Sequence, residues 1–273
     1  MSCRRLAELS KISKSCFYLY DETQQEWDYQ DYKLVKKYFD KGRQKLGIRQ
    51  LKMQIERSEG IVFNHKKIAR LKRKYGLVTK IRKRNVYRTF AKRKHEHDTF
   101  KNILNRSFSQ SVPDRVYSTD ITQINYGQKK AYVAAVKDLC TKEIVGKSVS
   151  ARIDLNLTNS ALDKALKRLS SDQKSNLMIH SDQGFHFTHF AYRNKLKLNG
   201  ITQSMSRKGN CIDNAPIESF FGHLKDLIEI DNCQNITDIE KEVTKQINYY
   251  NHRRPQLGLK KMPPSEYRRH LNF

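Results

Sequence analysis

Three acidic side chains stand inside dense polar motifs in the second half of the chain. Asp120 lies in STDIT, Asp182 in HSDQG and Glu218 in DNAPIESFFGHLK, with 35 residues, 183 to 217, between the last two. Carboxylate oxygens are ligands that Mg²⁺ and Mn²⁺ prefer. Two such ions about 3.5–4 Å apart can hold the attacking and the leaving oxygen of a phosphoryl transfer. Three carboxylates, one of them shared, are the smallest set for this, so the pattern predicts a two-metal site.

The predicted secondary structure brings these acids together. Alternating or continuous apolar patterns predict an antiparallel meander, followed by alternating helices and strands. The strands are expected at 116–126, 130–140, 143–150, 177–180 and 201–204, and the helices at 158–169, 187–198, 213–229 and 237–251. Asp120 then lies within a strand, Asp182 just past a strand end and Glu218 on a helix. This order predicts an α/β core with a mixed central sheet, in the order of a ribonuclease H-like fold.

Other interpretations of these acids remain open. Asp213 is the main rival for the third ligand, but on a helix it lies about 140° away from Glu218, which favours a role at the helix start and as a cap. Asp182 alone could cap a helix. Glu218 could pair with His223 or Lys225 on its own helix.

The first part of the chain is strongly basic. Residues 1–112 hold 29 lysines and arginines against 11 acids, residues 113–273 hold 25 against 17, and the whole chain carries a formal charge of +26. Such an excess favours nucleic acid as the partner over a merely solvated basic surface. The asymmetry predicts a DNA-gripping first part and a catalytic second part.

Helical periodicity runs through the basic part. A helix-turn-helix-like pair is predicted within 5–20, and further helices at 31–45, 48–57 and 65–75, the last with Asn64 as its cap and Gly76 as its stop. Residues 80–112 have few aliphatic side chains and are predicted to be a linker that follows DNA. We therefore divide the chain into an all-α DNA-binding region (1–79), a basic linker (80–112) and a catalytic core with a C-terminal helix and tail (113–273).

Several classes of protein are disfavoured. The five cysteines are widely spaced and show neither zinc-ligand spacing nor a disulfide framework. Charges interrupt every apolar run, and no apolar region follows the first arginines, so neither a membrane span nor a signal peptide is expected. The composition predicts a soluble cytoplasmic protein with reduced thiols.

Four ordered segments resemble the integrase core of bacterial insertion-sequence transposases of the DDE type, whose enzyme is usually encoded by a second, overlapping reading frame. They are STDIT, IHSDQGFHFT, SMSRKGNCIDNAPIESFFGHLK and INYYNHRRPQLGLKKMPPSEY, and together they span 113–270. The 35-residue spacing is the one that this family shares with retroviral integrases. A weaker resemblance, in GRQKLGIRQLKMQI and VFNHKKIARLKRKYGL, is to the family's helix-turn-helix segment. Tyr117 stands where the family often has Trp, and Phe187 where Tyr is frequent.

The resemblance implies a transposase that binds the ends of a mobile DNA element. With Mg²⁺ or Mn²⁺, two ions being expected, it would cleave and join DNA ends by water and then by a 3′-hydroxyl, without a covalent protein intermediate. Asp120, Asp182 and Glu218 take the metal-binding roles. The implied partners are double-stranded DNA, a homo-oligomer on paired ends, and a fused or partner protein from an upstream reading frame. A related nuclease, such as a Holliday-junction resolvase, and a domesticated DNA-binding protein without activity are the alternatives.

The expected DNA contacts are basic or amide side chains on the helix 65–75, in the loop 205–212, on the Glu218 helix and after the last long helix. They are Lys66, Lys67, Arg70, Arg73, Arg207, Lys208, Asn210, Lys225, Arg253 and Arg254.

Local roles are also predicted around these residues. Lys225 follows Glu218 by two helical turns and is expected on the same face. Ser181, Gln183 and Gly184 are expected to shape the turn around Asp182.

At the far end of the chain, the aromatic pair Tyr249 and Tyr250 is expected to pack the last long helix onto the core. Pro263 and Pro264 are expected in an extended, ordered tail.

Overall fold

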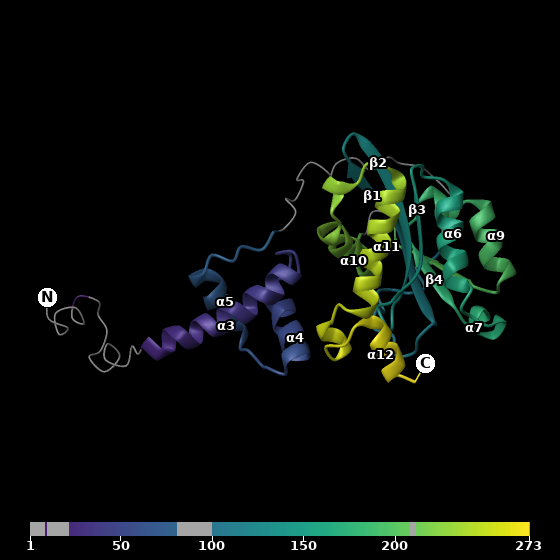
Figure 1. Ribbon diagram of the computed structural model, residues 1–273. Helices are drawn as coiled ribbons and strands as arrows, with labels where there is room; N and C mark the ends of the chain where they lie inside the picture. The colour runs from purple at the N-terminus through teal and green to yellow at the C-terminus, as the bar shows by residue number, and fades with distance from the viewer. Residues whose placement is uncertain (1–8, 10–21, 81–99, 208–210, 273) are drawn as a thin grey trace. The chain divides into compact units, whose positions relative to one another are not determined.

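The computed structural model describes residue 9 and residues 22–80, 100–207 and 211–272. The chain divides into two compact units, 1–82 and 83–273, each with its own hydrophobic core (Figure 1). The helical pair predicted within 5–20 lies, apart from residue 9, outside the described residues.

Three helices form the described part of the first unit: α3 (Glu22–Lys41), α4 (Ile48–Glu59) and α5 (His65–Lys74). Helix α3 begins nine residues before the predicted start, because residues 26–30 are mostly exposed and so lack the apolar period that marks a packed helix. The predicted cap is confirmed, since the Asn64 side chain accepts the backbone N–H of Lys66 at 2.9 Å. One apolar cluster joins the three helices through Val35, Tyr38, Phe39, Leu46, Leu51, Ile55, Phe63, Ile68 and Leu71.

A five-stranded mixed sheet forms the centre of the second unit. Its strands are β1 (Val116–Tyr126), β2 (Lys129–Asp138), β3 (Ile144–Ser150), β4 (Met178–Ser181) and β5 (Thr202–Met205). They lie in the order β3-β2-β1-β4-β5, with β1 antiparallel to β2 and parallel to β4. This order confirms the predicted ribonuclease H-like arrangement, and β1 has the predicted bounds.

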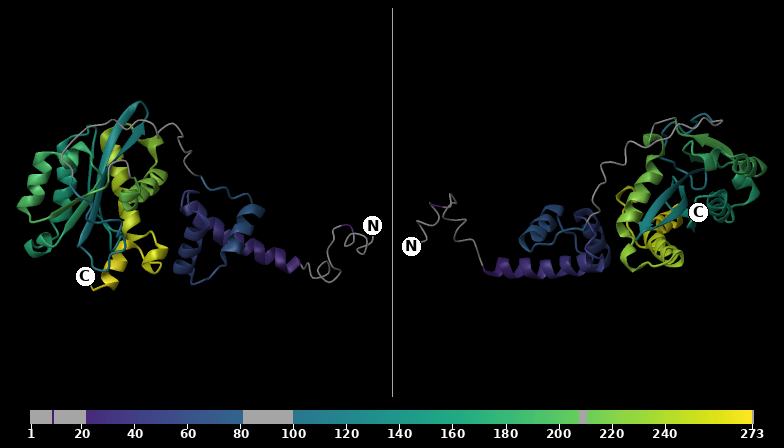
Figure 2. Two further views of the ribbon diagram at one scale, coloured as in Figure 1. Left: turned by 180° about the vertical axis from the view of Figure 1, so that it is seen from behind. Right: turned by 90° about the horizontal axis from the view of Figure 1, so that it is seen from above.

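Helices cover both faces of the sheet, as Figures 1 and 2 show. Helices α6 (Leu155–Leu166) and α9 (Phe190–Leu198) pack on the face that holds Tyr117, and α10 (Ala215–Leu227) and α11 (Ile236–His252) on the face that holds Ile124 and Tyr126. Since side chains alternate along a strand, the even-numbered residues of β1, Asp120 among them, face α10 and α11.

The remaining elements are short. They are α7 (Ser171–Ser175), α8 (Phe185–Thr188), α12 (Pro264–His270) and the 3₁₀ turns Cys211–Asn214 (η2), Ile230–Asn232 (η3) and Leu257–Leu259 (η4). The single helix predicted over 187–198 is broken at His189, whose extended backbone ends α8 and caps α9. None of the described helices has the length and apolar character needed to cross a membrane.

The extended tail predicted at Pro263 and Pro264 is wrong. Pro263 is the N-cap of α12 and Pro264 its first residue, a position where proline's missing N–H removes no helical hydrogen bond. The helix is held by Arg268, which is 8% exposed and bonds Asp114, Asp138 and Glu143.

Residues 100–112, which the sequence assigns to the linker, lie on the core in the structure. Leu104 is buried against Val116 and Leu139. The Ser204 hydroxyl accepts the backbone N–H groups of Ile103 and Leu104 at 3.0 and 3.1 Å. Asn102 and Arg106 also bind the Asp213 carboxylate, so the contacts that hold this stretch reach distant residues and leave no local pattern in the sequence.

Candidate active site

The register of β1 and β4 brings Asp120 beside Asp182. The strands are parallel, with Ser118 opposite His180. Asp120 and Asp182 each come two residues later, so they continue the same register on the same face of the sheet. Asp182 is one residue beyond the end of β4, where the chain leaves the sheet.

The start of α10 is fixed over this face. Asn214 Oδ1 accepts the Ser118 hydroxyl at 2.7 Å, and Asn214 Nδ2 donates to the Thr119 carbonyl at 3.4 Å. Glu218 follows Asn214 by four residues and therefore lies on the same side of the helix. Asp120 follows Ser118 by two residues on the strand beneath, so Glu218 is directed towards the two aspartates.

The charges of Asp182 and Glu218 both act on Asp120. The pKa of Asp120 is raised to about 8, first by burial and then by the charge of Asp182, with a further contribution from Glu218. The backbone N–H of Ile121, which donates to Asp120 Oδ1 at 2.7 Å, and the charge of Lys225 act in the opposite direction. Three mutually repelling carboxylates create a place where a cation is favoured.

The donor set suits a hard divalent cation, because each of the three residues offers carboxylate oxygens. Within the described part of the chain, no three His, Cys, Asp or Glu side chains already form a ready metal-ligand cluster. The side chains therefore share a region without sharing a coordination sphere.

The turn after β4 holds Asp182 tightly. Its Oδ1 accepts the backbone N–H of Gly184 at 2.9 Å, and its backbone carbonyl accepts the Ser181 hydroxyl at 2.9 Å. A Cβ on Gly184 would meet Asp182 Oδ1 at 2.8 Å, so a side chain here would displace that carboxylate. The side chain of Gln183 donates to the Ser206 carbonyl at 3.0 Å and closes the turn against the neighbouring loop. The contacts of Ser181 and Gln183 fit the predicted turn-shaping roles. Gly184 has an ordinary extended backbone, with φ −64° and ψ 146°, so the prediction that the turn needs its conformational freedom is wrong.

Asp213 has a different role from the one predicted. It lies in η2 at the start of the α10 segment, as expected, but among the described residues its carboxylate accepts no backbone N–H group of α10. It is fully buried and accepts hydrogen bonds from the side chains of Arg207, Arg106 and Asn102. Hydrogen bonds from Arg207 hold the pKa of Asp213 well below its usual range. Arg207, expected at DNA, is thus committed to an intramolecular pair.

His180 is a positioning residue that the sequence interpretation missed. It is fully buried, with Nδ1 2.9 Å from the Ser204 hydroxyl and Nε2 3.0 Å from the Asp213 carbonyl. Burial lowers its pKa, so the neutral ring is favoured. His180 thereby ties η2 to β4. The available signal was its place two residues before Asp182, which puts both on one face of the strand.

Cations of helix α5 are paired with acids of α3. Arg70 bonds both carboxylate oxygens of the buried Asp28 at 2.5 and 2.6 Å, and Lys67 pairs with Asp31. Lys66 and Arg73 are exposed. Two of the four predicted DNA contacts on α5 therefore already have acidic partners on α3.

The remaining predicted DNA contacts differ in exposure. Lys225 is half-buried and near enough to Asp120 to lower its pKa. Arg253 is exposed, whereas Arg254 is half-buried, with its guanidinium 5.9 Å from the Tyr250 ring centre. Tyr250 itself is buried, as predicted. Lys208 and Asn210 lie outside the described residues.

Family models agree with this architecture. Two models described as integrase core domain match residues 110–211 and 199–264, and one described as HTH-like domain matches residues 26–85. The second unit thus belongs to the integrase-core class, and the first carries an HTH-like domain.

Proteins of similar sequence identify the family within the integrase-core class. The chain is 36% identical over 266 residues to the transposase InsK of insertion sequence element IS150 from Escherichia coli strain K12, covering 96% of this chain and 92% of the relative. It is 29% identical over 230 residues to the transposase InsF of insertion sequence IS3A from the same strain, covering 82% and 78%. The catalytic core domain of HTLV-2 integrase in complex with magnesium matches at 15% identity and a TM-score of 0.46, covering 57% of this chain and 97% of that one. The chain belongs to the family of insertion-sequence transposases with an integrase core.

Proposed function

We propose that this transposase binds the ends of a mobile DNA element and catalyses metal-dependent cleavage and strand transfer with Asp120, Asp182 and Glu218. The observation that carries the proposal is the parallel register of β1 and β4, which places Asp120 and Asp182 on one face of the sheet beneath the helix start that Asn214 anchors and Glu218 follows. The charges of Asp182 and Glu218, together with burial, raise the pKa of Asp120. Carboxylates are gathered in this way where a cation offsets their repulsion. The transposase names of the relatives support it.

In this proposal the three carboxylates hold two Mg²⁺ or Mn²⁺ ions. When bound, the ions activate the attacking oxygen and stabilise the departing one. The chain's own groups position the reactants. Asp182 is oriented by Gly184, Glu218 by the anchoring of Asn214 on β1, and Lys225 supplies a cation for a neighbouring phosphate.

The first unit and the exposed arginine of the C-terminal segment are assigned to DNA binding. Lys66, Arg73 and Arg253 are exposed, and each suits a phosphate contact. Joining two element ends in one reaction calls for at least two copies of the chain on DNA.

The test is an assay of the purified full chain on a labelled duplex whose sequence is taken from the DNA flanking the gene. Asp120→Asn, Asp182→Asn and Glu218→Gln should each abolish cleavage and joining in Mg²⁺ or Mn²⁺ while DNA binding persists. Asp231→Asn changes an exposed acid on η3 and should behave as the parent. Retained joining by any of the three triad variants would overturn the assignment of that residue.

Metal binding has its own readout. Ions that bind only the folded protein raise its unfolding temperature with concentration. Mn²⁺ should therefore raise the unfolding temperature of the parent chain and of Asp231→Asn, and should have a smaller effect on Asp120→Asn. An equal rise in all three proteins would place the metal elsewhere.

A further inference from the structure

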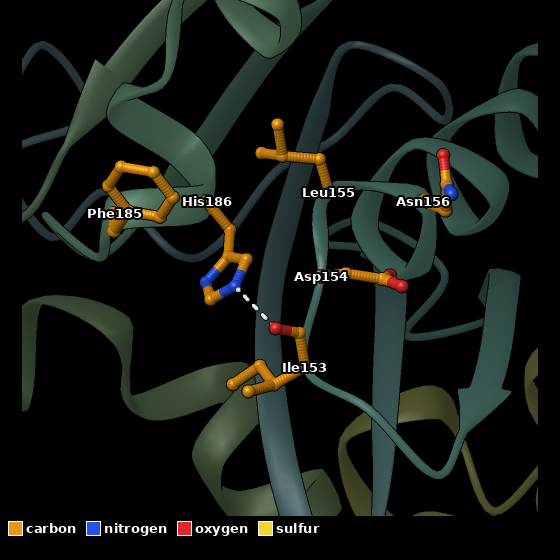
Figure 3. A pocket seen from close by; sticks show the side chains of 6 residues that line it. All are labelled: Ile153, Asp154, Leu155, Asn156, Phe185 and His186. Atoms are coloured by element: carbon orange, nitrogen blue, oxygen red, sulfur yellow. Dashed lines mark hydrogen bonds between the residues drawn. The ribbon is translucent and has the colours of Figure 1, made fainter.

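An open pocket lies beside the turn that carries Asp182. Its volume is about 640 Å³, and it is lined by Ile153, Asp154, Leu155, Asn156, Phe185 and His186. One wall comes from the start of α6 and the other from α8. Figure 3 shows the rings of Phe185 and His186 on one side and the Ile153 and Leu155 side chains framing the other.

Phe185 is half-exposed although it is a large apolar side chain. Its exposed fraction is 51%, and Ile153 across the pocket is 46% exposed. The ring makes perpendicular contacts with His186 and His189, at centroid distances of 5.6 and 5.3 Å. His186 is steadied in turn by the Ile153 carbonyl, 3.4 Å from its Nε2. An exposed aromatic ring held in a built pocket is the kind of surface that takes up a flat partner.

The pocket lies close to the proposed catalytic residue Asp182. Phe185 follows Asp182 by three residues, and the chain spans at most about 3.6 Å per residue, so their Cα atoms lie within about 11 Å. Nucleotides along a strand rise by about 3.4 Å each, so a base two or three steps from a phosphate at Asp182 can reach this ring. The bond from Gly184 to Asp182 Oδ1 makes the intervening turn tight.

We propose that this pocket binds an unpaired nucleobase of the DNA strand being joined, stacked on Phe185. Every base offers a π-face, and stacking on aromatic side chains is the usual way in which proteins hold an unpaired base. Arg152 is exposed directly before Ile153 and supplies a cation for the adjoining phosphate. The inference rests on the proposed function, because it assumes that DNA passes Asp182.

The test compares two probes with the full-length protein in Asp182→Asn form, so that strand chemistry does not interfere. One is a duplex with a single unpaired 2-aminopurine, and the other is the same duplex fully paired. The phosphate contacts are common to both probes. The ratio of the affinity for the unpaired probe to that for the paired probe therefore measures the contribution of the unpaired base. The unpaired probe should bind more tightly, with quenched fluorescence.

Phe185→Ala in this background should lower the affinity ratio by about 5- to 150-fold, the range that loss of one stacked base implies. Phe185→Trp should keep the ratio, because it keeps a π-face. Phe185→Leu keeps an apolar side chain but has no π-face, so it should abolish the preference for the unpaired probe. This variant keeps the test valid even if Phe185→Ala fails to fold. Phe190→Ala removes an aromatic ring that is 74% exposed but outside the pocket, and serves as the matched control.

An unchanged ratio in Phe185→Leu, or an equal loss in Phe190→Ala, would overturn the proposal. So would a parent protein that does not distinguish the two probes, which is the result expected if the patch serves another protein. Failure of the proposed function is seen separately, as absence of metal-dependent cleavage by the chain with Asp182 intact.

Discussion

Arg207 and Asp213 form a two-point ion pair within one loop. Arg207 Nε and Nη2 donate to the two carboxylate oxygens of Asp213 at 2.9 and 3.0 Å, and the Arg207 backbone N–H donates to the same carboxylate at 3.0 Å. Arg106, more than a hundred residues earlier in the chain, donates to it as well at 2.7 Å. The carboxylate therefore joins the segment before β1 to the loop that leads into the Glu218 helix.

This pair predicts that Arg207 acts on the fold rather than on DNA. Arg207→Ala should lower the unfolding temperature, and adding it to Asp213→Ala should have little further effect, because the partner is already gone. The slope of log affinity against log salt should stay unchanged, whereas Arg253→Ala should reduce it by about 1. Additive losses of stability, or a reduced salt slope for Arg207→Ala, would contradict this view.

The Asp28–Arg70 pair predicts acid sensitivity in the helical unit. Hydrogen bonds from Arg70 hold the pKa of Asp28 well below its ordinary value of 3.8. A carboxyl with a lowered folded-state pKa stabilises the fold above the unfolded pKa and loses this effect as pH falls below it. The unit should therefore weaken as pH falls below about 4.

That transition can be followed selectively. Trp27 is the only tryptophan of the chain and adjoins Asp28 on α3, so its fluorescence reports on this unit. Asp28→Asn should lower the stability of this unit at pH 7. It should also make the further loss of stability between pH 5 and pH 3 smaller than in the parent. Asp40→Asn changes an exposed acid on the same helix and should keep the parent's pH profile. A parent-like profile for Asp28→Asn would contradict the prediction.

Arg268 should be a major contributor to the stability of the catalytic core. Its guanidinium donates to Asp114 at 2.7 and 2.9 Å and to Asp138 at 3.1 Å, with Arg268, Asp114 and Asp138 all buried. Removing one partner of a buried ionic group typically costs about 3–5 kcal/mol. Arg268→Met should lower the free energy of unfolding in urea by that amount. Arg269→Ala, on the exposed side of α12, should stay within about 0.5 kcal/mol of the parent.

Gly146 should be required where α6 crosses β3. A Cβ at this position would lie 2.1 Å from the Ala161 carbonyl oxygen and 2.9 Å from the Ala165 Cβ. Helix α6 would have to move, so Gly146→Ala should destabilise the core by about 1–3 kcal/mol. Gly222→Ala is the matched control, because a Cβ there meets nothing within 4 Å and favours the helix by up to about 1 kcal/mol. Equal effects of the two substitutions in a urea titration would refute the packing argument.

Periodic segments of the fold were predictable, and buried polar contacts were not. The bounds of β1 follow from its alternation, and Asn64 was identifiable as a cap because capping is local. The partners of Asp213 lie at positions 102, 106 and 207, and no spacing rule connects them. Helix α12 was missed for the same reason. It is a short helix that begins at the second of two prolines, and the acids that bind its Arg268 are distant in the sequence.

At the candidate site, the acidic residues themselves were easier to predict from the sequence than the side chains that surround and position them. The polar motifs singled out Asp120, Asp182 and Glu218, and strand parity explains why the first two share a face. The role of His180 depends on η2 folding back over β4, a contact between residues 33 positions apart. The pairing of Arg70 with Asp28 likewise spans 42 positions, so charge density alone did not reveal it.

The pairing of β1 with β4 also determines which changes of length the molecule can tolerate. Strand β4 has only four residues, and its alignment with β1 sets the side of the sheet on which Asp182 emerges. One residue inserted or deleted between Met178 and Asp182 would turn that carboxylate towards α6 and away from Asp120. The same change at Ser175 and Asn176, which are exposed and precede β4, would leave this phase unaltered. Among descendants of this gene, insertions and deletions should therefore occur in the connecting segments. They should be absent from the few residues of β4 that place Asp182 on the same face as Asp120.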